Sequence, residues 1–301
     1  MRWDPMPSAR TLAQAAFKDW EVLTSEASLS FDAAMLALID DRIDVILGGR
    51  TSSYTPKTDA ERSCTEAIEQ FIIDVAALTD AQRDSVFGTL GARSYPFFQV
   101  LYIRDFDFRF RAAMTQLFGE SEAGSAAAEP ERAAGAEAPD LWPALDRFLT
   151  DVASLDALDP VLTELIRLRG ARAHNCRICQ SRREVAAIEG GADESTFDKI
   201  DFYETSDLDE RSKVALRLTD AVIWQPAAFP AGLVEQVRAT FSPDEALEIV
   251  LDLTRNAANK IPVALQADQA VVTVGVEYFS LGSDGTLAYG LPAPVGAPGR
   301  G

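Results

Sequence analysis

Two closely spaced cysteines, Cys176 and Cys179, are the residues of this sequence best suited to chemistry. Thiols three positions apart can close a small disulfide ring or bind a metal ion as thiolates. A structural zinc ion would need two further ligands, and the sequence offers only His174 and, in the other half of the chain, Cys64. The spacing therefore favours a redox-active pair, with two buried and unreactive cysteines as the alternative.

Positive charge is concentrated around this pair. Five cationic or titratable side chains lie within twelve residues: Arg172, His174, Arg177, Arg182 and Arg183. We expect a helix over residues 176–188 that begins near Asn175, which places both thiols in its first turn. Cationic neighbours and the N–H groups of a first turn both lower the pKa of a thiol. This pattern predicts reactive thiols, unless the arginines are solvated or pair with acids.

The composition describes a soluble globular protein. Its 301 residues are 47% hydrophobic and 25% charged, and a chain of this length buries about three quarters of its unfolded surface. With 28 basic and 47 acidic residues the net charge is −19, which argues against nucleic acid and anionic membranes as partners. There is no apolar run of about eighteen residues to cross a membrane and no export signal. Three sparse cysteines then predict a cytoplasmic protein with reduced thiols rather than a structural disulfide framework, so that any disulfide is expected to be functional.

The chain is expected to form two halves, residues 1–118 and 141–290. Residues 119–140 are rich in Ala, Gly, Glu and Pro, which have little to bury, so they predict a flexible linker. Residues 291–301 predict a disordered tail for the same reason.

Both halves are expected to be helical, because apolar residues recur at intervals of three and four. Helix starts are predicted at Asp159-Pro160 and at Ser242-Pro243, where a capping side chain precedes a proline in the first turn. Near the end, β-branched and aromatic residues surround Gly282-Ser283-Asp284-Gly285, which predicts a β-hairpin.

The two halves also show signs of duplication. Glu61-Arg62-Ser63 recurs as Glu210-Arg211-Ser212, and each triplet opens an amphipathic helix. The helices over residues 97–113 and 248–264 then correspond, as do the stretches near residues 40 and 170. About twenty residues, those around the cysteine pair, have no counterpart in the first copy. The first repeat is therefore predicted to lack chemistry; chance similarity between amphipathic helices is the alternative.

One segment carries a resemblance to a known family. LTELIRLRGARAHNCRICQSRREVAAIEGGADE resembles the core motif of the carboxymuconolactone decarboxylase superfamily, in its alkylhydroperoxidase D-like branch. That motif has a glutamate, eleven residues, a cysteine, two residues, a second cysteine, three residues and a histidine. Glu164, Cys176 and Cys179 match it, whereas Arg183 stands at the histidine position. The likeness continues over residues 210–265, with Asn256 and Asn259.

The resemblance implies an all-α fold, a duplicated helical bundle that assembles as a homo-oligomer, a trimer of two-repeat chains. It implies that Cys179 attacks a small-molecule hydroperoxide and becomes a sulfenic acid, that Cys176 resolves it to a disulfide, and that an external dithiol reduces the pair. No cofactor or metal is expected. The residues themselves leave the order of the cysteines open, because a thiol at the start of a helix is usually the more acidic and exposed one.

The arginine at position 183 changes the expected proton chemistry, because a guanidinium does not pass a proton near neutral pH. If the helices that carry Glu164 and Cys179 are antiparallel, Arg183 would pair with Glu164 and act as a fixed charge. His174 is then either a substitute base or a turn residue with no catalytic role.

Three functions remain open at this point. The first is a thiol-dependent peroxidase or disulfide oxidoreductase that uses Cys176 and Cys179. The second is a non-redox decarboxylase or isomerase on the same scaffold, and the third is a catalytically silent structural protein. Cys64, in the other half, is expected to be a packed core residue.

Overall fold

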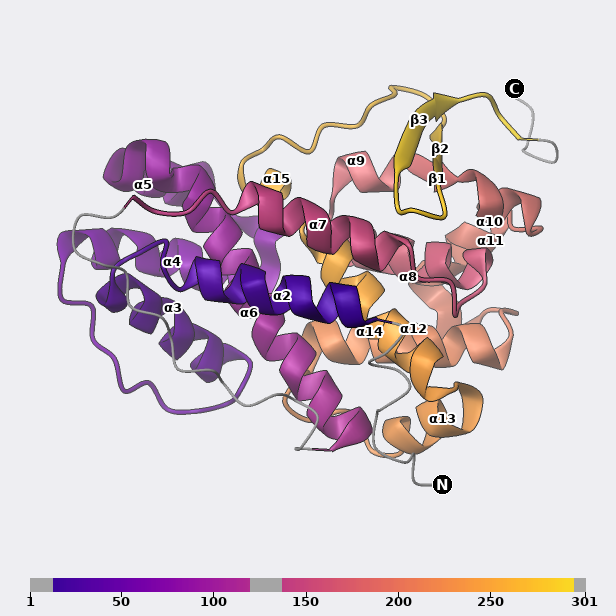
Figure 1. Ribbon diagram of the computed structural model, residues 1–301, viewed down its shortest axis with the longest axis horizontal. Coiled ribbons are helices and arrows are strands. Elements are labelled where there is room, and N and C mark those ends of the chain that lie inside the picture. Colours follow the sequence, from indigo (N-terminus) through magenta and orange to yellow (C-terminus); the bar gives the residue numbers. More distant parts are fainter. Residues whose placement is uncertain (1–12, 120–136, 295–301) are drawn as a thin grey trace.

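The computed structural model describes residues 13–119 and 137–294, and it is mostly helical with a small sheet near the carboxyl end (Figure 1). Most of the expected linker, residues 120–136, and most of the expected tail, residues 295–301, lie outside the described residues. The helical class predicted from the sequence is confirmed.

The first half consists of helices joined by short turns. They are α2 (Gln14–Ala27), α3 (Ala33–Ile46), α4 (Asp59–Asp74), η1 (Val75–Ala77), α5 (Asp80–Leu90), η2 (Gly91–Arg93) and the long α6 (Ser94–Phe118).

The second half has more and shorter elements. Its helices are α7 (Trp142–Ala153), α8 (Pro160–Ala173), α9 (Arg177–Gln180), α10 (Val185–Glu189), α11 (Glu194–Asp198), η4 (Lys199–Thr205), α12 (Glu210–Trp224), α13 (Leu233–Thr240), α14 (Pro243–Ala257) and α15 (Lys260–Ala264). Its strands are β1 (Arg182–Glu184), β2 (Glu277–Leu281) and β3 (Leu287–Leu291).

Local capping explains where the main helices of the second half begin. The Asp159 side chain accepts a hydrogen bond from Leu162 N, directly before Pro160. Ser242 and Glu245 form a reciprocal capping box at the start of α14. These side chains satisfy N–H groups that have no partner within the helix, so both predicted starts are confirmed.

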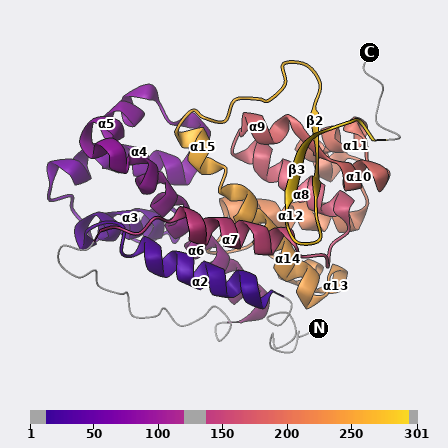
Figure 2. The ribbon, with the colours of Figure 1, turned by 45° about the horizontal axis from the view of Figure 1, so that its top comes forward.

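The two halves share one hydrophobic core. Helix α2 lies side by side with α7 in both ribbon views, and α6 packs against α14 (Figures 1 and 2). Tyr102 of α6 is fully buried and donates a hydrogen bond to Thr254 O of α14, at 2.8 Å. Burial of large side chains from both halves in one cluster holds them together.

The predicted hairpin is confirmed, with β2 antiparallel to β3. Its tip rests on α7: Gly285 has φ +78°, and a Cβ atom there would lie 2.1 Å from Thr150 O. Only glycine allows this approach. The hairpin is therefore fixed over α7, where it forms one wall of the site described below.

The helix expected over residues 176–188 is wrong. The chain forms the single turn of α9 and then strand β1, which pairs in parallel with β2, before the short helix α10 begins at Val185. Arg183 is opposite Tyr278 in this register. Pairing with a strand about a hundred residues later replaces the local helical preference.

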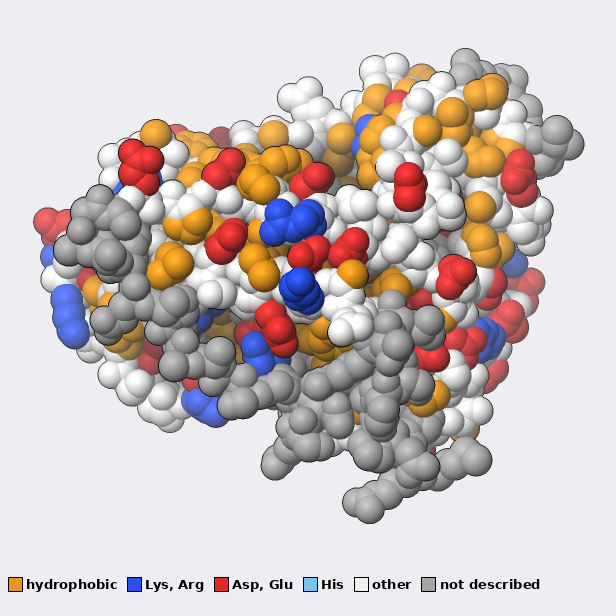
Figure 3. Space-filling view, in the orientation of Figure 1, with side chains coloured by type: hydrophobic (Ala, Val, Ile, Leu, Met, Phe, Trp, Pro, Cys, Tyr) orange, Lys and Arg blue, Asp and Glu red, His pale blue; other side chains and the backbone are white. Residues whose placement is uncertain are grey.

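Acidic side chains are spread over the face seen in Figure 3 and are dense on the side that carries α11 to α13. Hydrophobic side chains gather near the hairpin in the same view. Exposed ones in this region are Val271, Val274, Leu287 and Tyr289. Among the described residues, no helix is long and apolar enough to span a membrane.

Candidate functional site

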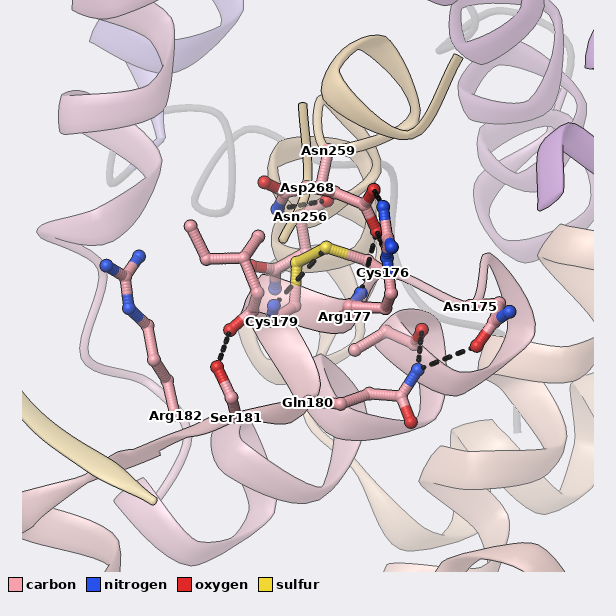
Figure 4. The surroundings of a disulfide bond; sticks show 12 residues. Asn175, Cys176, Arg177, Cys179, Gln180, Ser181, Arg182, Asn256, Asn259 and Asp268 are labelled. Atoms are coloured by element: carbon pink, nitrogen blue, oxygen red, sulfur yellow. Dashed lines mark hydrogen bonds and ion pairs between the residues drawn. A yellow bond between two sulfur atoms is a disulfide. The ribbon is translucent and has the colours of Figure 1, made fainter. Parts of the chain in front are cut away.

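The cysteine pair lies at the start of α9, directly after the tight turn that follows α8. Asn175, the residue before the pair, adopts φ 47°, a left-handed conformation that asparagine tolerates better than most residues. Cys176 caps the first turn of α9, and its Sγ accepts a hydrogen bond from Cys179 N at 3.3 Å. The two Cα atoms are 5.3 Å apart and the sulfurs form a disulfide bond (Figure 4).

Asp268 anchors this turn from a distant part of the chain. Its carboxylate accepts hydrogen bonds from Arg177 N at 2.9 Å and from Arg177 Nη2 at 2.6 Å, and its carbonyl accepts one from Ile178 N. Burial alone would raise the pKa of Asp268, but the hydrogen bonds from Arg177 outweigh it and keep the pKa below its ordinary value. The first N–H groups of α9 are thus paired with an aspartate that no sequence pattern pointed to.

The two sulfurs differ in their access to solvent. Cys176 is 1% exposed and Cys179 is 8% exposed. Cys179 lines a pocket of about 400 Å³ together with Ile178, Asn256 and Asn259. Figure 4 shows both asparagines next to the disulfide. Cys179 is therefore the cysteine that a small molecule in this pocket meets first.

The pocket has an apolar rim and a partly cationic interior. Helix α7 contributes Trp142 and the hairpin contributes Leu287, both close to half exposed. Arg167 and Arg255 reach it from α8 and α14. A concave, mostly apolar surface with a few placed charges is typical of a small-molecule site.

Glu164 is fully buried and pairs with Arg167, not with Arg183. Arg167 donates from Nε to Glu164 Oε2 at 2.6 Å and from Nη2 to Oε1 at 2.7 Å. The same guanidinium donates to Cys179 O at 2.9 Å and to Arg182 O at 2.8 Å. Glu164 is thus connected to the cysteine turn through Arg167.

The predicted ion pair between Glu164 and Arg183 is wrong, because the chain turns into β1 and carries Arg183 to another side. Arg183 donates to both carboxylate oxygens of Glu194, at 2.9 and 2.8 Å, and its guanidinium lies over the ring of Phe197. Arg183 is absent from the lining of the cysteine pocket. The structure does not bring it to the thiols.

His174 also faces away from the cysteine pocket. It caps the end of α8 and is buried with its ring edge-on to Phe106, at 6.1 Å between centroids. Burial lowers the pKa of His174 well below its ordinary value, and the positive charges of Lys260 and Arg109 lower it further. The imidazole is therefore neutral at pH 7, in the core between the two halves.

The arginines near the cysteines are paired with acids, which was one of the alternatives left open. Their partners include Asp201 for Arg172, Asp268 for Arg177, Glu277 for Arg182 and Glu194 for Arg183. The positive field expected around the thiols is correspondingly reduced.

Cys64 takes no part in the site. It lies in α4, is fully buried, and burial raises the pKa of its thiol to about 11. Among the described residues, no group of three or more His, Cys, Asp or Glu side chains is arranged to hold a metal ion.

Comparison with known proteins finds two relatives from strains of Mycobacterium tuberculosis. They are named uncharacterized protein MT2376 and uncharacterized protein Rv2313c, and each is 41% identical over 237 residues, which covers 78% of this chain and 83% of the relative. The chain belongs to the family of these mycobacterial proteins. No protein-family model matches the chain, and no solved structure matches it.

In this member of the family, the second half of the chain also buries three acids that lie outside the lining of the cysteine pocket and that sequence reasoning did not identify. Burial raises the pKa of Glu184 to about 7, and nearby Glu164 adds to the shift. On α14, burial raises the pKa of Glu248 to about 7 and that of Asp252 well above its ordinary value. Sequence reasoning could have found Glu248 and Asp252, because both lie on the apolar face of an amphipathic helix. Acidic residues are rarely buried on such a face, so their position there is informative.

Proposed function

We propose that this protein is a thiol-dependent peroxidase or disulfide oxidoreductase that reduces a hydroperoxide with Cys176 and Cys179. The observation that carries the proposal is the disulfide-bonded pair with one sulfur at the wall of a pocket. A buried pair with no cavity beside it would have favoured a structural role.

The chemistry starts from the dithiol. The Cys179 thiolate attacks the outer oxygen of the hydroperoxide; the O–O bond breaks, Cys179 becomes a sulfenic acid, and the alkoxide takes a proton from water and leaves as the alcohol. Cys176 then attacks the Cys179 sulfur, which forms the disulfide and releases water. An external dithiol restores both thiols by exchange and is itself oxidised to a disulfide.

The geometry supports this division of roles. Cys179 has the greater exposure and lines the pocket, whereas Cys176 lies below it and is 1% exposed. The hydrogen bond from Cys179 N to Cys176 Sγ stabilises negative charge on the inner sulfur, which favours its attack on a sulfenic acid. This order agrees with the one that the family resemblance implies.

Glu164 acts here as a positioning residue. With Arg183 at the histidine position of the motif and paired with Glu194, a glutamate–histidine relay is replaced by the Glu164–Arg167 pair. Arg167 holds the carbonyl of Cys179, so the pair fixes the turn that carries the reacting sulfur.

We also propose that the bundle is a duplicated alkylhydroperoxidase D-like fold. Helix α3 packs on α4 and α6 in the first half, as α8 packs on α12 and α14 in the second. Residues 47–58 connect α3 to α4 without helix or strand, whereas the corresponding connection between α8 and α12 holds α9, β1, α10, α11 and η4. This supports a first repeat without the cysteine pair.

Sulfenic acid trapping tests the proposed order of the cysteines. The fully reduced Cys176→Ser and Cys179→Ser variants are treated with cumene hydroperoxide and dimedone, and the adducts are located by mass spectrometry. We expect an adduct on Cys179 in C176S and none on Cys176 in C179S at the same exposure. Equal labelling of both variants, or labelling of neither, contradicts the proposal. The C64S variant is the control and should label like the wild type.

A further inference from the structure

One arginine of the cysteine pocket has a charge that the protein does not neutralise. Arg255, in the last turn of α14, donates from Nε to Leu149 O at 2.9 Å. Among the described residues, its two terminal nitrogens make no hydrogen bond to any group, and no carboxylate lies within 4 Å of them. The side chain is half-buried and lines the pocket.

The other two arginines of the pocket differ from Arg255 in this respect. Arg167 has a bidentate partner in Glu164. Arg182 pairs with Glu277 at 2.7 Å, and its guanidinium lies 4.1 Å from the ring centroid of Tyr289. Both charges are therefore paired with a carboxylate, and among the described residues Arg255 is the one of these three arginines that has no carboxylate partner.

Two acids, one on the same helix and one in the pocket lining, form no ion pair with Arg255. Asp252 lies one turn before Arg255 on α14, is 3% exposed, and its Oδ2 has no hydrogen-bond partner among the described residues. Burial raises the pKa of Asp252 well above its ordinary value, and the charge of Arg255 opposes only part of this shift. Asp146 also lines the pocket but lies on its exposed side. Burial lowers the pKa of Arg255, and the charge of Asp252 opposes this shift without reversing it.

We infer that Arg255 binds the carboxylate of an organic acid whose apolar chain fills the pocket and whose reactive end reaches Cys179. A guanidinium whose two terminal nitrogens are open can donate to both oxygens of a single carboxylate. Trp142, Phe279 and Leu287 provide the apolar surface for a chain. A volume of about 400 Å³ accommodates a chain of medium length.

This inference rests on the proposed function for its reactive end: the substrate is the hydroperoxide of a carboxylic acid, and it leaves as the corresponding hydroxy acid. The carboxylate site itself is independent of any redox step. It also explains how an anionic substrate binds to a protein whose net charge is −19.

Calorimetric titration of the disulfide form tests the site without peroxide. Octanoate is the probe, and octanamide is its neutral isostere. We expect octanoate to bind wild-type protein about 10-fold to 100-fold more tightly than octanamide, the range of one charge-assisted contact. Arg255→Gln should abolish this preference and Arg255→Lys should retain part of it. Arg62→Gln, an exposed arginine of the first half, is the matched control and should leave the preference unchanged.

Equal binding of octanoate and octanamide by wild-type protein overturns the inference, and so does a preference for octanoate that survives in R255Q. If R255Q does not fold, the wild-type comparison still decides. If octanoate binds through Arg255 but peroxide never oxidises the cysteines, the carboxylate site stands and the proposed function fails. If peroxide forms the disulfide but octanoate does not bind, the proposed function stands and the carboxylate site fails.

Discussion

The Glu164–Arg167 pair is the interaction through which α8 holds the cysteine turn, and its removal should be measurable as lost stability. Glu164 is 0% exposed and the Arg167 side chain 11%, so neither charge is well solvated when its partner is removed. Loss of one member of such a pair costs about 3–5 kcal/mol. Glu164→Gln and Arg167→Gln should each therefore lower the free energy of unfolding by this amount.

A double-mutant cycle isolates the pair from its surroundings. In E164Q/R167Q both charges are absent, so the loss should fall short of the summed single losses by about 2–3 kcal/mol. The control cycle is E164Q/R183Q. Arg183 pairs with Glu194, and the two losses should add to within about 0.5 kcal/mol.

Urea unfolding of the disulfide form at pH 7, followed by tryptophan fluorescence, gives all the required free energies. A loss below about 1 kcal/mol in E164Q, together with no coupling to R167Q, would refute the reasoning. Coupling of E164Q to R183Q would show that the ion pair expected from the antiparallel-helix argument forms after all.

Three further predictions concern buried residues outside the lining of the cysteine pocket. The pKa of Glu248 is raised to about 7 in the folded protein, so the carboxyl stabilises the fold below its unfolded pKa, and this stability is lost as the pH rises through about 7. Between pH 5 and pH 8, we expect the free energy of unfolding of the wild type to fall by about 2.5 kcal/mol more than that of Glu248→Gln. Identical pH profiles of the two proteins would contradict this. Cys64, with a pKa of about 11, should react with iodoacetamide at pH 8 only after unfolding, and fast labelling of the native protein would count against its burial. Asp268→Ala removes the hydrogen-bond partner of the first N–H groups of α9 and should lower the free energy of unfolding by about 1–2 kcal/mol. The control is Asp59→Ala at an exposed aspartate, which should change the free energy of unfolding by less than about 0.5 kcal/mol.

Features set by neighbouring residues could be predicted from the sequence. The start of α8 at Pro160 and the start of α14 at Pro243 depend on caps within three residues, so the pattern alone identifies them. The hairpin turn at Gly282–Gly285 is equally local. The burial of Cys64 follows from the apolar face of a single helix.

Features set by distant pairing could not be predicted. Strand β1 forms because β2 lies beside it, and that contact joins residues more than ninety positions apart. The same is true of Asp268, which caps α9 from beyond α15. Once β1 replaces a helix, the geometric argument that placed Arg183 opposite Glu164 no longer applies.

The true partner of Glu164 was nevertheless within reach of sequence reasoning. Arg167 lies three residues later on the same helix, and acid–base pairs at this spacing are neighbours on a helix surface. The family motif drew attention to position 183 instead, because that position holds the histidine in the motif.

The most direct test of the central claim is the count of free thiols after one equivalent of peroxide. The protein is fully reduced, desalted, treated with one equivalent of cumene hydroperoxide, unfolded in excess iodoacetamide and analysed by peptide mass spectrometry. We predict that Cys176 and Cys179 are recovered as one intramolecular disulfide while Cys64 is alkylated. Alkylation of all three cysteines, to the extent found without peroxide, would contradict the account.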